Sequence, residues 1–231
     1  MNCRENKIHL LLLEEEIEEA ICAIFHSVLF HRTLPTLMFK NGCVSYNSYI
    51  GTSDIDCRTI PITYIVVSSL EMKTKVNDPV CQFALVLRQQ SHSGDSKGTI
   101  ILEFATHKKG WALGGNEQSP WEKWIINVEL TKIVSEDVYE HKLRLVNQIT
   151  DEIFHAMELI NGPQSYVPSM GNSKAEMEGV VDFNLSADIS PYKFSIHWRT
   201  PTSSGNSGTG ISQAAGFVGS AVKRILKDGR F

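Results

Sequence analysis

A stripe of apolar side chains at helical spacing runs through residues 135–161, and it decides what kind of fold this chain can adopt. Its members recur every three or four residues: Leu145, Val146, Ile149, Ile153, Phe154, Met157 and Ile160. Gly162 and Pro163 follow at once, and such a pair ends a helix. Because a helix with one apolar side has to bury that side, the chain must supply a second layer for it to pack against.

Two further helices show the same spacing. Residues 15–31 carry a broad apolar stripe from Ile17 to Leu29, and residues 71–90 carry a narrower one from Val80 to Leu87. Within the second, Asp78 and Pro79 form a good N-cap and first-turn pair, so we expect its true first turn there.

Strands account for most of the remaining chain. Residues 8–13 predict a buried strand, 63–67 a strand buried on both faces, and 99–106 and 121–131 two more. In the last of these, every second residue is apolar and shares one face: Trp124, Ile126, Val128 and Leu130. Residues 180–186 and 192–200 suggest two late strands. Helices and strands together indicate an α+β fold.

Bulk properties exclude several classes of protein. The chain has 231 residues, of which 42% are hydrophobic and 21% charged, and this fits one globular domain with a tail. A net charge of -4 and no basic stripe argue against a nucleic-acid partner. The apolar run at residues 8–13 is too short to cross a bilayer, so we expect no stable membrane insertion. Five scattered cysteines without a CxxC pair predict reduced thiols.

Trp111 is the residue that this composition does not explain. It lies between two lysines and a Gly-rich stretch, in the connection between the strands at 99–106 and 121–131. Trp121 and Trp124 can be buried in the second strand. A large aromatic side chain beside a short Gly-rich loop either packs back on the sheet or is displayed to a partner.

Catalytic motifs are not apparent. Asp54 and Asp56 would face one side of a strand and suit a metal or an acid/base pair, although a solvated edge explains them equally well. Gly114 and Gly115 lack the spacing of a phosphate-binding loop. The sequence therefore predicts no catalytic, cofactor-binding or metal-binding residue, and it favours a binding protein.

Several short strings in a fixed order resemble the autophagy-related protein 101 family. They are "MNCR", "FHSVLFHR", "DIDCRTI", "LEF", "HKKGW", "PWEKW" and "YKFSIHW", and they extend from Met1 to about Trp198. The resemblance implies a HORMA domain over residues 1–200, with a central antiparallel sheet, helices packed on one face and a C-terminal safety-belt segment. The composition of residues 201–231 predicts a flexible Gly/Ser segment and a short basic amphipathic helix, and the Gly/Ser segment has no counterpart in the resemblance.

The same resemblance implies a function and partners. The family provides a non-enzymatic adaptor of autophagy initiation, which heterodimerises with the HORMA domain of autophagy-related protein 13 and stabilises it within a ULK-type kinase complex. Its implied location is the cytoplasm and, during autophagy, the phagophore assembly site. No cofactor is implied.

Two sets of site residues follow from the resemblance. The family displays a tryptophan and a phenylalanine on a protruding loop that recruits downstream autophagy factors; Trp111 matches the tryptophan, whereas Ala112 and Leu113 replace the proline and the phenylalanine. The partner HORMA interface is expected around the densest family-like strings: Val28, Phe30, His31, Arg32, Ile55 and Cys57.

Three other interpretations stay open at the level of sequence. One is a HORMA adaptor of the checkpoint or repair type, which closes its belt over a linear peptide. Another is an enzyme or metal protein that uses Asp54, Asp56 and a histidine. The third is a structural subunit whose tryptophans are all internal.

Overall fold

The computed structural model of the chain describes residues 3–40, 43–46, 49–92, 96–109, 116–132 and 137–201. The predicted Gly/Ser segment and basic helix after Pro201 lie outside these residues. The elements follow in this order: β1 (Arg4–Leu12), the 3-10 turn η1 (Glu14–Glu16), α1 (Ile17–His31), β2 (Thr33–Pro35), β3 (Leu37–Lys40), β4 (Cys43–Tyr46), β5 (Thr52–Asp56), β6 (Thr63–Val67), α2 (Leu70–Ser91), β7 (Lys97–Lys109), β8 (Asn116–Leu130), α3 (Val138–Asn161), α4 (Lys174–Met177), β9 (Ile189–Pro191) and β10 (Phe194–Arg199).

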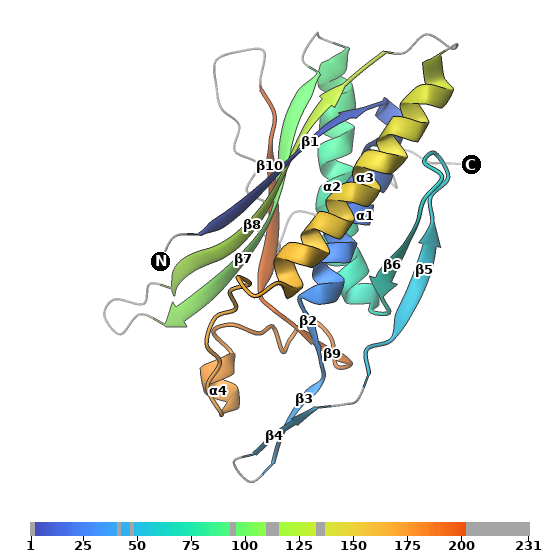
Figure 1. Cartoon of the computed structure of the whole chain (residues 1–231). Helices are drawn as coiled ribbons and strands as arrows, with labels where there is room; N and C mark the ends of the chain where they lie inside the picture. Colours follow the sequence, from blue (N-terminus) through green and yellow to red (C-terminus); the bar gives the residue numbers. More distant parts are fainter. Residues whose placement is uncertain are drawn as a thin grey trace, which may run out of the picture.

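Four strands form the main sheet in the order β1-β8-β7-β10 (Figure 1). β7 pairs antiparallel with β8 and β10, but β1 runs parallel to β8. The sheet is therefore mixed, and the fully antiparallel sheet predicted from the resemblance is wrong at this edge. A parallel pair needs a long crossover, and α1 and α2 lie in the chain between β1 and β8. The α+β class is confirmed, and the arrangement is compatible with a HORMA fold.

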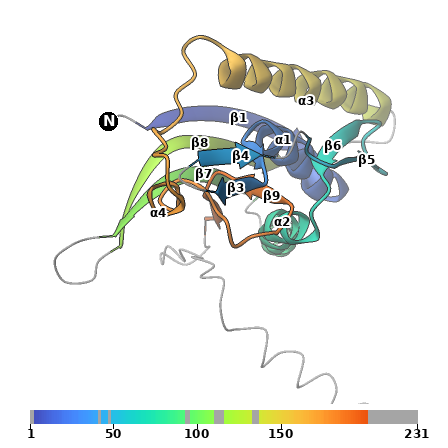
Figure 2. The same ribbon diagram turned by 90° about the horizontal axis from the view of Figure 1, so that it is seen from below.

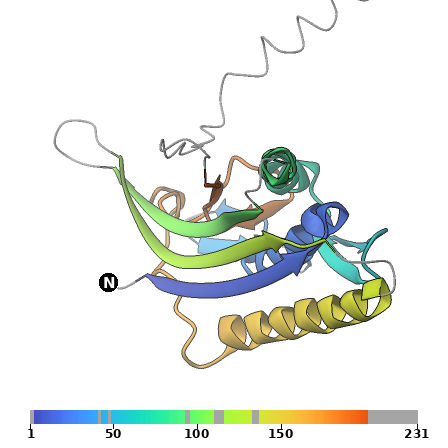
Figure 3. The same cartoon turned by 90° about the horizontal axis from the view of Figure 1, so that it is seen from above.

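One face of this sheet is buried and the other meets solvent. Residues alternate along each strand, and the buried set comprises Ile8, Leu10, Leu12, Ile100, Leu102, Phe104, Trp124, Ile126, Val128, Phe194 and Ile196. The prediction of a shared apolar face in the strand of Trp124 is thus confirmed. Figure 3 shows α1 and α2 against one side of the sheet and α3 along its β1 edge. There the Gln148 side chain of α3 donates to the backbone carbonyl of His9 at 2.6 Å.

Helix α1 is the centre of the core. Its side chains from Ile17 to Leu29 are nearly all buried, because α2, α3 and β6 surround it on the sides that the sheet leaves open (Figure 2). The breadth of the predicted apolar stripe reflects this position. Glu19 of α1 also accepts the backbone N–H groups of Arg58, Thr59 and Ile60, and so attaches the β5–β6 connection to the helix.

Helix α2 differs from its prediction at its start. It begins at Leu70, where Ser69 Oγ accepts the N–H of Met72 at 3.2 Å, and Pro79 lies inside the helix. An internal proline removes one helical hydrogen bond and costs about 3 kcal/mol. Burial of Met72 and Val76 on the core side favours continuing the helix through it.

Two predicted strands also need correction. Residues 180–186 form only an isolated bridge at Val181, because local contacts such as Asn184 N–H to Asp182 Oδ1 (3.1 Å) compete with strand pairing. The strand at 63–67 exists as β6, but it is not buried on both faces, since Ile65 is 45% exposed. β6 pairs with β5 and packs on α1 from one side.

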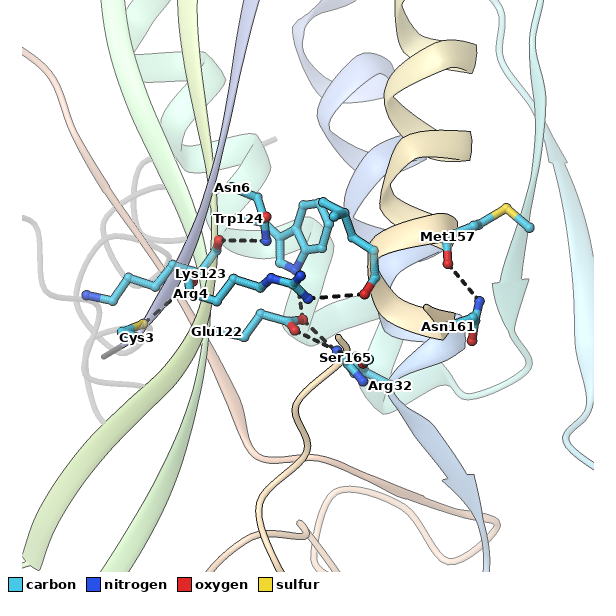
Figure 4. Close-up of polar contacts among 11 residues, drawn as sticks. Cys3, Arg4, Asn6, Arg32, Glu122, Lys123, Trp124, Met157, Asn161 and Ser165 are labelled. Carbon is cyan, nitrogen blue, oxygen red and sulfur yellow. Dashed lines mark hydrogen bonds and ion pairs between the residues drawn. The ribbon is translucent and has the colours of Figure 1, made fainter. Parts of the chain in front are cut away.

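A buried ion pair joins α1 to β8. Arg32 follows the last residue of α1, and its Nε and Nη2 donate to Glu122 Oε1 (3.1 Å) and Oε2 (2.6 Å) (Figure 4). Trp124 Nε1 donates to Glu122 Oε1 at 2.9 Å, and the Arg32 guanidinium lies 5.3 Å from the centroid of the Trp121 ring. The Arg32 carbonyl accepts the backbone N–H of Tyr192 at 3.0 Å. Both charges are almost fully buried, so removing either one would leave the other buried without a partner.

Breaking this pair should destabilise the protein strongly. We expect Arg32→Met to lower the free energy of unfolding by about 3–5 kcal/mol, because Glu122 is left charged and buried. Arg32→Met combined with Glu122→Met should recover part of that loss, since no charge is stranded. Urea unfolding followed by tryptophan fluorescence measures both, and a loss below about 1 kcal/mol for Arg32→Met would contradict this account.

His26 makes the fold sensitive to acid. It is 2% exposed, its Nε2 lies 3.3 Å from Asn77 Oδ1, and its ring stacks on Tyr64. Burial lowers the pKa of His26 from 6.5 to about 4. The unfolded chain therefore binds a proton in a pH range where the folded chain does not, and stability falls as the pH drops from 6.5 towards 4.

We expect this effect to reach about 3 kcal/mol at the acid end, at about 1.4 kcal/mol for each pKa unit. His26→Gln should reduce the pH dependence of the unfolding free energy between pH 6.5 and 4. The part of that dependence that comes from carboxylates should remain. Denaturant unfolding of both proteins at a series of pH values measures the difference. Parallel curves would show that His26 is not responsible.

Candidate functional site

The β7–β8 hairpin extends beyond the main sheet. β1 pairs with β8 over residues 122–130 and β10 pairs with β7 over residues 99–104. Residues 105–109 and 116–120, here called the arm, pair with each other and with no other strand of the described chain. Figure 1 shows the hairpin leaving the body of the molecule at this end. The far end of the arm therefore lies away from the helices.

A β-bulge marks the base of the arm. Phe104 pairs with Glu122 and Ala105 with Pro120, so Trp121 is the extra residue. A bulge re-aims side chains, and Trp121 and Glu122 are accordingly both buried although they are neighbours. The Trp121 ring contacts the rings of Phe104, Tyr166 and Tyr192, with centroids 5.4, 6.2 and 5.7 Å away.

The arm is also fixed to the chain that follows α4. The backbone N–H of His107 donates to the carbonyl of Gly179 at 2.7 Å. A Cβ at position 179 would meet the His107 carbonyl oxygen at 2.8 Å, so the close approach requires glycine there. The base of the arm is thus held by aromatic packing on one side and by this backbone contact on another.

The three predicted loop residues, Trp111, Ala112 and Leu113, lie outside the described residues. The strands on either side of the loop are described: β7 ends at Lys109 and β8 begins at Asn116. Trp121 and Trp124 are buried, at 4% and 1% exposure, as the sequence led us to expect. The display of Trp111 remains a prediction.

The six residues predicted for a partner interface lie in different environments. Val28 is fully buried in the core and Arg32 is used in the ion pair with Glu122. Phe30 and His31 are partly buried at the end of α1, with their rings edge to face at 5.2 Å. His31 Nδ1 lies 3.4 Å from the Asn161 amide nitrogen, which brings the ends of α1 and α3 together.

Ile55 and Cys57 belong to β5 and the turn after it. Ile55 is partly exposed on β5, and Cys57 is partly buried against the core. Burial, reinforced by the nearby carboxylates of Glu19 and Asp56, raises the pKa of Cys57 to about 11. Its thiol is therefore protonated at neutral pH and is a poor nucleophile.

Helix α3 displays apolar side chains that the sequence pattern did not assign to a surface. Tyr139, Leu143 and Phe154 are 78%, 51% and 60% exposed. At 100° per residue they lie within about 60° of one another around the helix, so they form one line, here called the α3 stripe. Phe154 was predicted as core, and that prediction is wrong. Leu145, Ile149 and Ile160 fill the core side, and at 100° per residue Phe154 lies about 120–180° around the helix from them.

Asp54 and Asp56 are both exposed on β5. Asp56 Oδ1 accepts a hydrogen bond from Thr63 Oγ1 at 2.7 Å, across the β5–β6 pair. Within the described ranges, no three His, Cys, Asp or Glu side chains are grouped so that they could hold a metal ion. None of the helices in these ranges is long and apolar enough to span a membrane.

Comparison with known proteins gives one consistent family. The sequence profile described as Autophagy-related protein 101 matches residues 9–174. The protein of that name from Xenopus tropicalis is 29% identical over 229 residues, covering 99% of this chain and 98% of the relative. The Homo sapiens protein is 28% identical with the same coverage. The Arabidopsis thaliana protein is 22% identical over 192 residues, which cover 74% of this chain and 83% of the relative.

If the α3 stripe is a binding surface, it should contribute little to the stability of the chain alone. We expect Leu143→Gln and Phe154→Gln each to change the free energy of unfolding by less than about 0.5 kcal/mol. Ile149→Ala, on the buried side of the same helix, should cost about 2–5 kcal/mol. Urea unfolding of the three variants makes the comparison, and a large loss for Leu143→Gln would place that side chain in the core.

Proposed function

The chain belongs to the autophagy-related protein 101 family, and from this we propose that it is a non-enzymatic adaptor of autophagy initiation. It heterodimerises with the HORMA domain of autophagy-related protein 13, stabilises that domain within a ULK-type kinase complex, and recruits downstream factors through the Trp111 loop. It acts in the cytoplasm and at the phagophore assembly site. The residues after α4 serve as its safety-belt segment.

The observation that carries this proposal is the presence of two separate surfaces suited to protein contacts. The α3 stripe is an exposed apolar line on a helix whose opposite side is core, and such lines mark places where a partner covers the helix. The arm leaves the body at its own end of the molecule (Figure 1). An adaptor needs two such surfaces, so that one partner is held while another is recruited.

The partner face combines the α3 stripe with the partly exposed members of the predicted interface. Phe30 and His31 join it through the contact between His31 and Asn161 at the end of α3. Ile55 and Cys57 lie on the β5–β6 unit, which packs on α1. Val28 and Arg32 contribute indirectly. They are buried, and they hold in place the end of α1 that carries Phe30 and His31.

The recruiting loop depends on the stiffness of the arm. Trp111 lies in a six-residue connection whose two ends are set by paired strands. A tryptophan that enters a partner's pocket contributes about 2 kcal/mol or more to binding. Leu113 adds apolar area in place of the family's phenylalanine, but without stacking. Because the base is held at Trp121 and Gly179, little arm motion has to be frozen when a partner binds.

Co-purification with the HORMA domain of autophagy-related protein 13 from the same organism tests the proposal, with the mass of the complex determined in solution. We expect a 1:1 complex. Leu143→Asp with Phe154→Asp should weaken it about thirtyfold or more, because two apolar contacts become buried charges. Leu85→Asp is the matched control, since Leu85 is 56% exposed on α2. Trp111→Ala should leave the complex intact.

Each remaining outcome has a clear meaning. Loss of the complex with Trp111→Ala would place Trp111 in the dimer interface instead of the recruiting loop. Equal weakening by the α3 double variant and by Leu85→Asp would remove the assignment of the partner face. If two well-folded proteins form no complex, the heterodimer proposal fails, and capture of a linear peptide by a closed belt becomes the function to test.

A further inference from the structure

A small cavity of about 160 Å³ lies at the base of the arm. Its polar lining comes from four parts of the chain: Lys75 of α2, His107 and Gln118 of the arm, Asp182, and Lys193 in the turn before β10. Glu103 of β7 and Ser195 of β10 also border it. None of these side chains belongs to the α3 stripe or to the predicted loop.

Both carboxylates of the cavity are already neutralised. Asp182 Oδ2 pairs with Lys75 Nζ at 3.2 Å, and the Lys75 ammonium also lies 4.3 Å from the centroid of the Phe194 ring. Glu103 pairs at 3.0 Å with Lys123, which lies outside the cavity. Lys193 has no carboxylate oxygen within 4.0 Å among the described residues. The cavity therefore has an excess positive charge at Lys193.

Hydrogen-bond donors outnumber acceptors at the same place. The backbone N–H groups of His107 and Lys193 donate to the carbonyls of Gly179 and Val180, whereas neither side chain has a hydrogen bond to another described residue. Burial lowers the pKa of His107, and the ammonium of Lys193 lowers it further. The imidazole is therefore neutral at pH 7 and carries one N–H. The Gln118 amide and the Ser195 hydroxyl add further donors.

We propose that this cavity binds a phosphate-class oxyanion, with Lys193 supplying the charge and His107 and Gln118 supplying hydrogen bonds. At roughly 30 Å³ for each water molecule, its volume holds about five waters. A tetrahedral oxyanion fits such a space and matches the charge of Lys193, whereas the polar lining does not suit an acyl chain. The anion would link the arm, through His107 and Gln118, to the turn that carries Lys193. The proposal does not depend on the adaptor function.

Titration of the full chain with inorganic phosphate, at neutral pH and constant ionic strength, tests the site. The readout is the imidazole resonances of His107, assigned by comparison with His107→Asn. We expect a saturable shift in the millimolar range. Lys193→Met should weaken binding about tenfold or more, because a hydrogen bond to a charged group is lost. Lys193→Arg should retain binding.

Lys7→Met is the matched control, because the Lys7 side chain is 61% exposed on β1 and lies outside the cavity. It should bind phosphate as the unchanged protein does. A parallel titration with phosphoserine separates the two sources of the group: tighter binding than phosphate indicates a phosphorylated side chain as ligand, and equal or weaker binding indicates free phosphate. A shift that does not saturate, or one that Lys193→Met leaves unchanged, would overturn the proposal.

Discussion

The buried contact between Arg32 and Glu122 is the interaction on which the rest of the structure depends. It links the end of the central helix α1 to the bulged strand β8, where both oxygens of Glu122 are occupied. The Arg32 carbonyl also accepts the backbone N–H of Tyr192, which lies in the last part of the described chain. A buried pair of this kind need not add stability over apolar residues of similar volume, but it tolerates few alternative packings. We interpret it as a device that fixes one arrangement of these segments.

The base of the arm follows from that contact. Glu122 has to point into the core to meet Arg32. The bulge allows the preceding residue, Trp121, to turn into the core as well. Trp121 then packs between Phe104 and Tyr192, and the Arg32 guanidinium covers its ring. The arm is thereby set at a fixed angle to the sheet. On the open face of the sheet, cross-strand ion pairs such as Lys97 with Glu129 keep the surface polar.

Sequence reasoning succeeded where one periodicity governed a long segment. The three helices and the apolar face of β8 at Trp124 and Ile126 follow from spacing alone, because burial on one side dictates that spacing. It failed where contacts distant in sequence decide the outcome. The direction of β1 beside β8 is set by the crossover, and the start of α2 is set by burial around Met72, which outweighed the signal at Pro79.

The binding surfaces were harder to predict than the fold. Phe154 is as apolar as the core residues of α3, and only its angle around the helix, about 120–180° from Leu145, Ile149 and Ile160, separates it from them. Arg32 and Glu122 are ninety positions apart, and nothing local in the sequence pairs them. Lys193 and His107 likewise meet at one cavity only because β10, which follows Lys193, lies beside β7, which carries His107. Family resemblance supplied the significance of Trp111, which spacing alone did not.

The most direct test of the two-surface account is site-specific photo-crosslinking within the reconstituted complex. A photoreactive residue is placed in turn at the positions of Leu143, Leu85 and Trp111, and the products with the HORMA partner are identified by mass spectrometry. The account predicts crosslinks to that partner from position 143 and none from positions 85 or 111. Crosslinks from position 111 to the HORMA partner, with none from position 143, would contradict it.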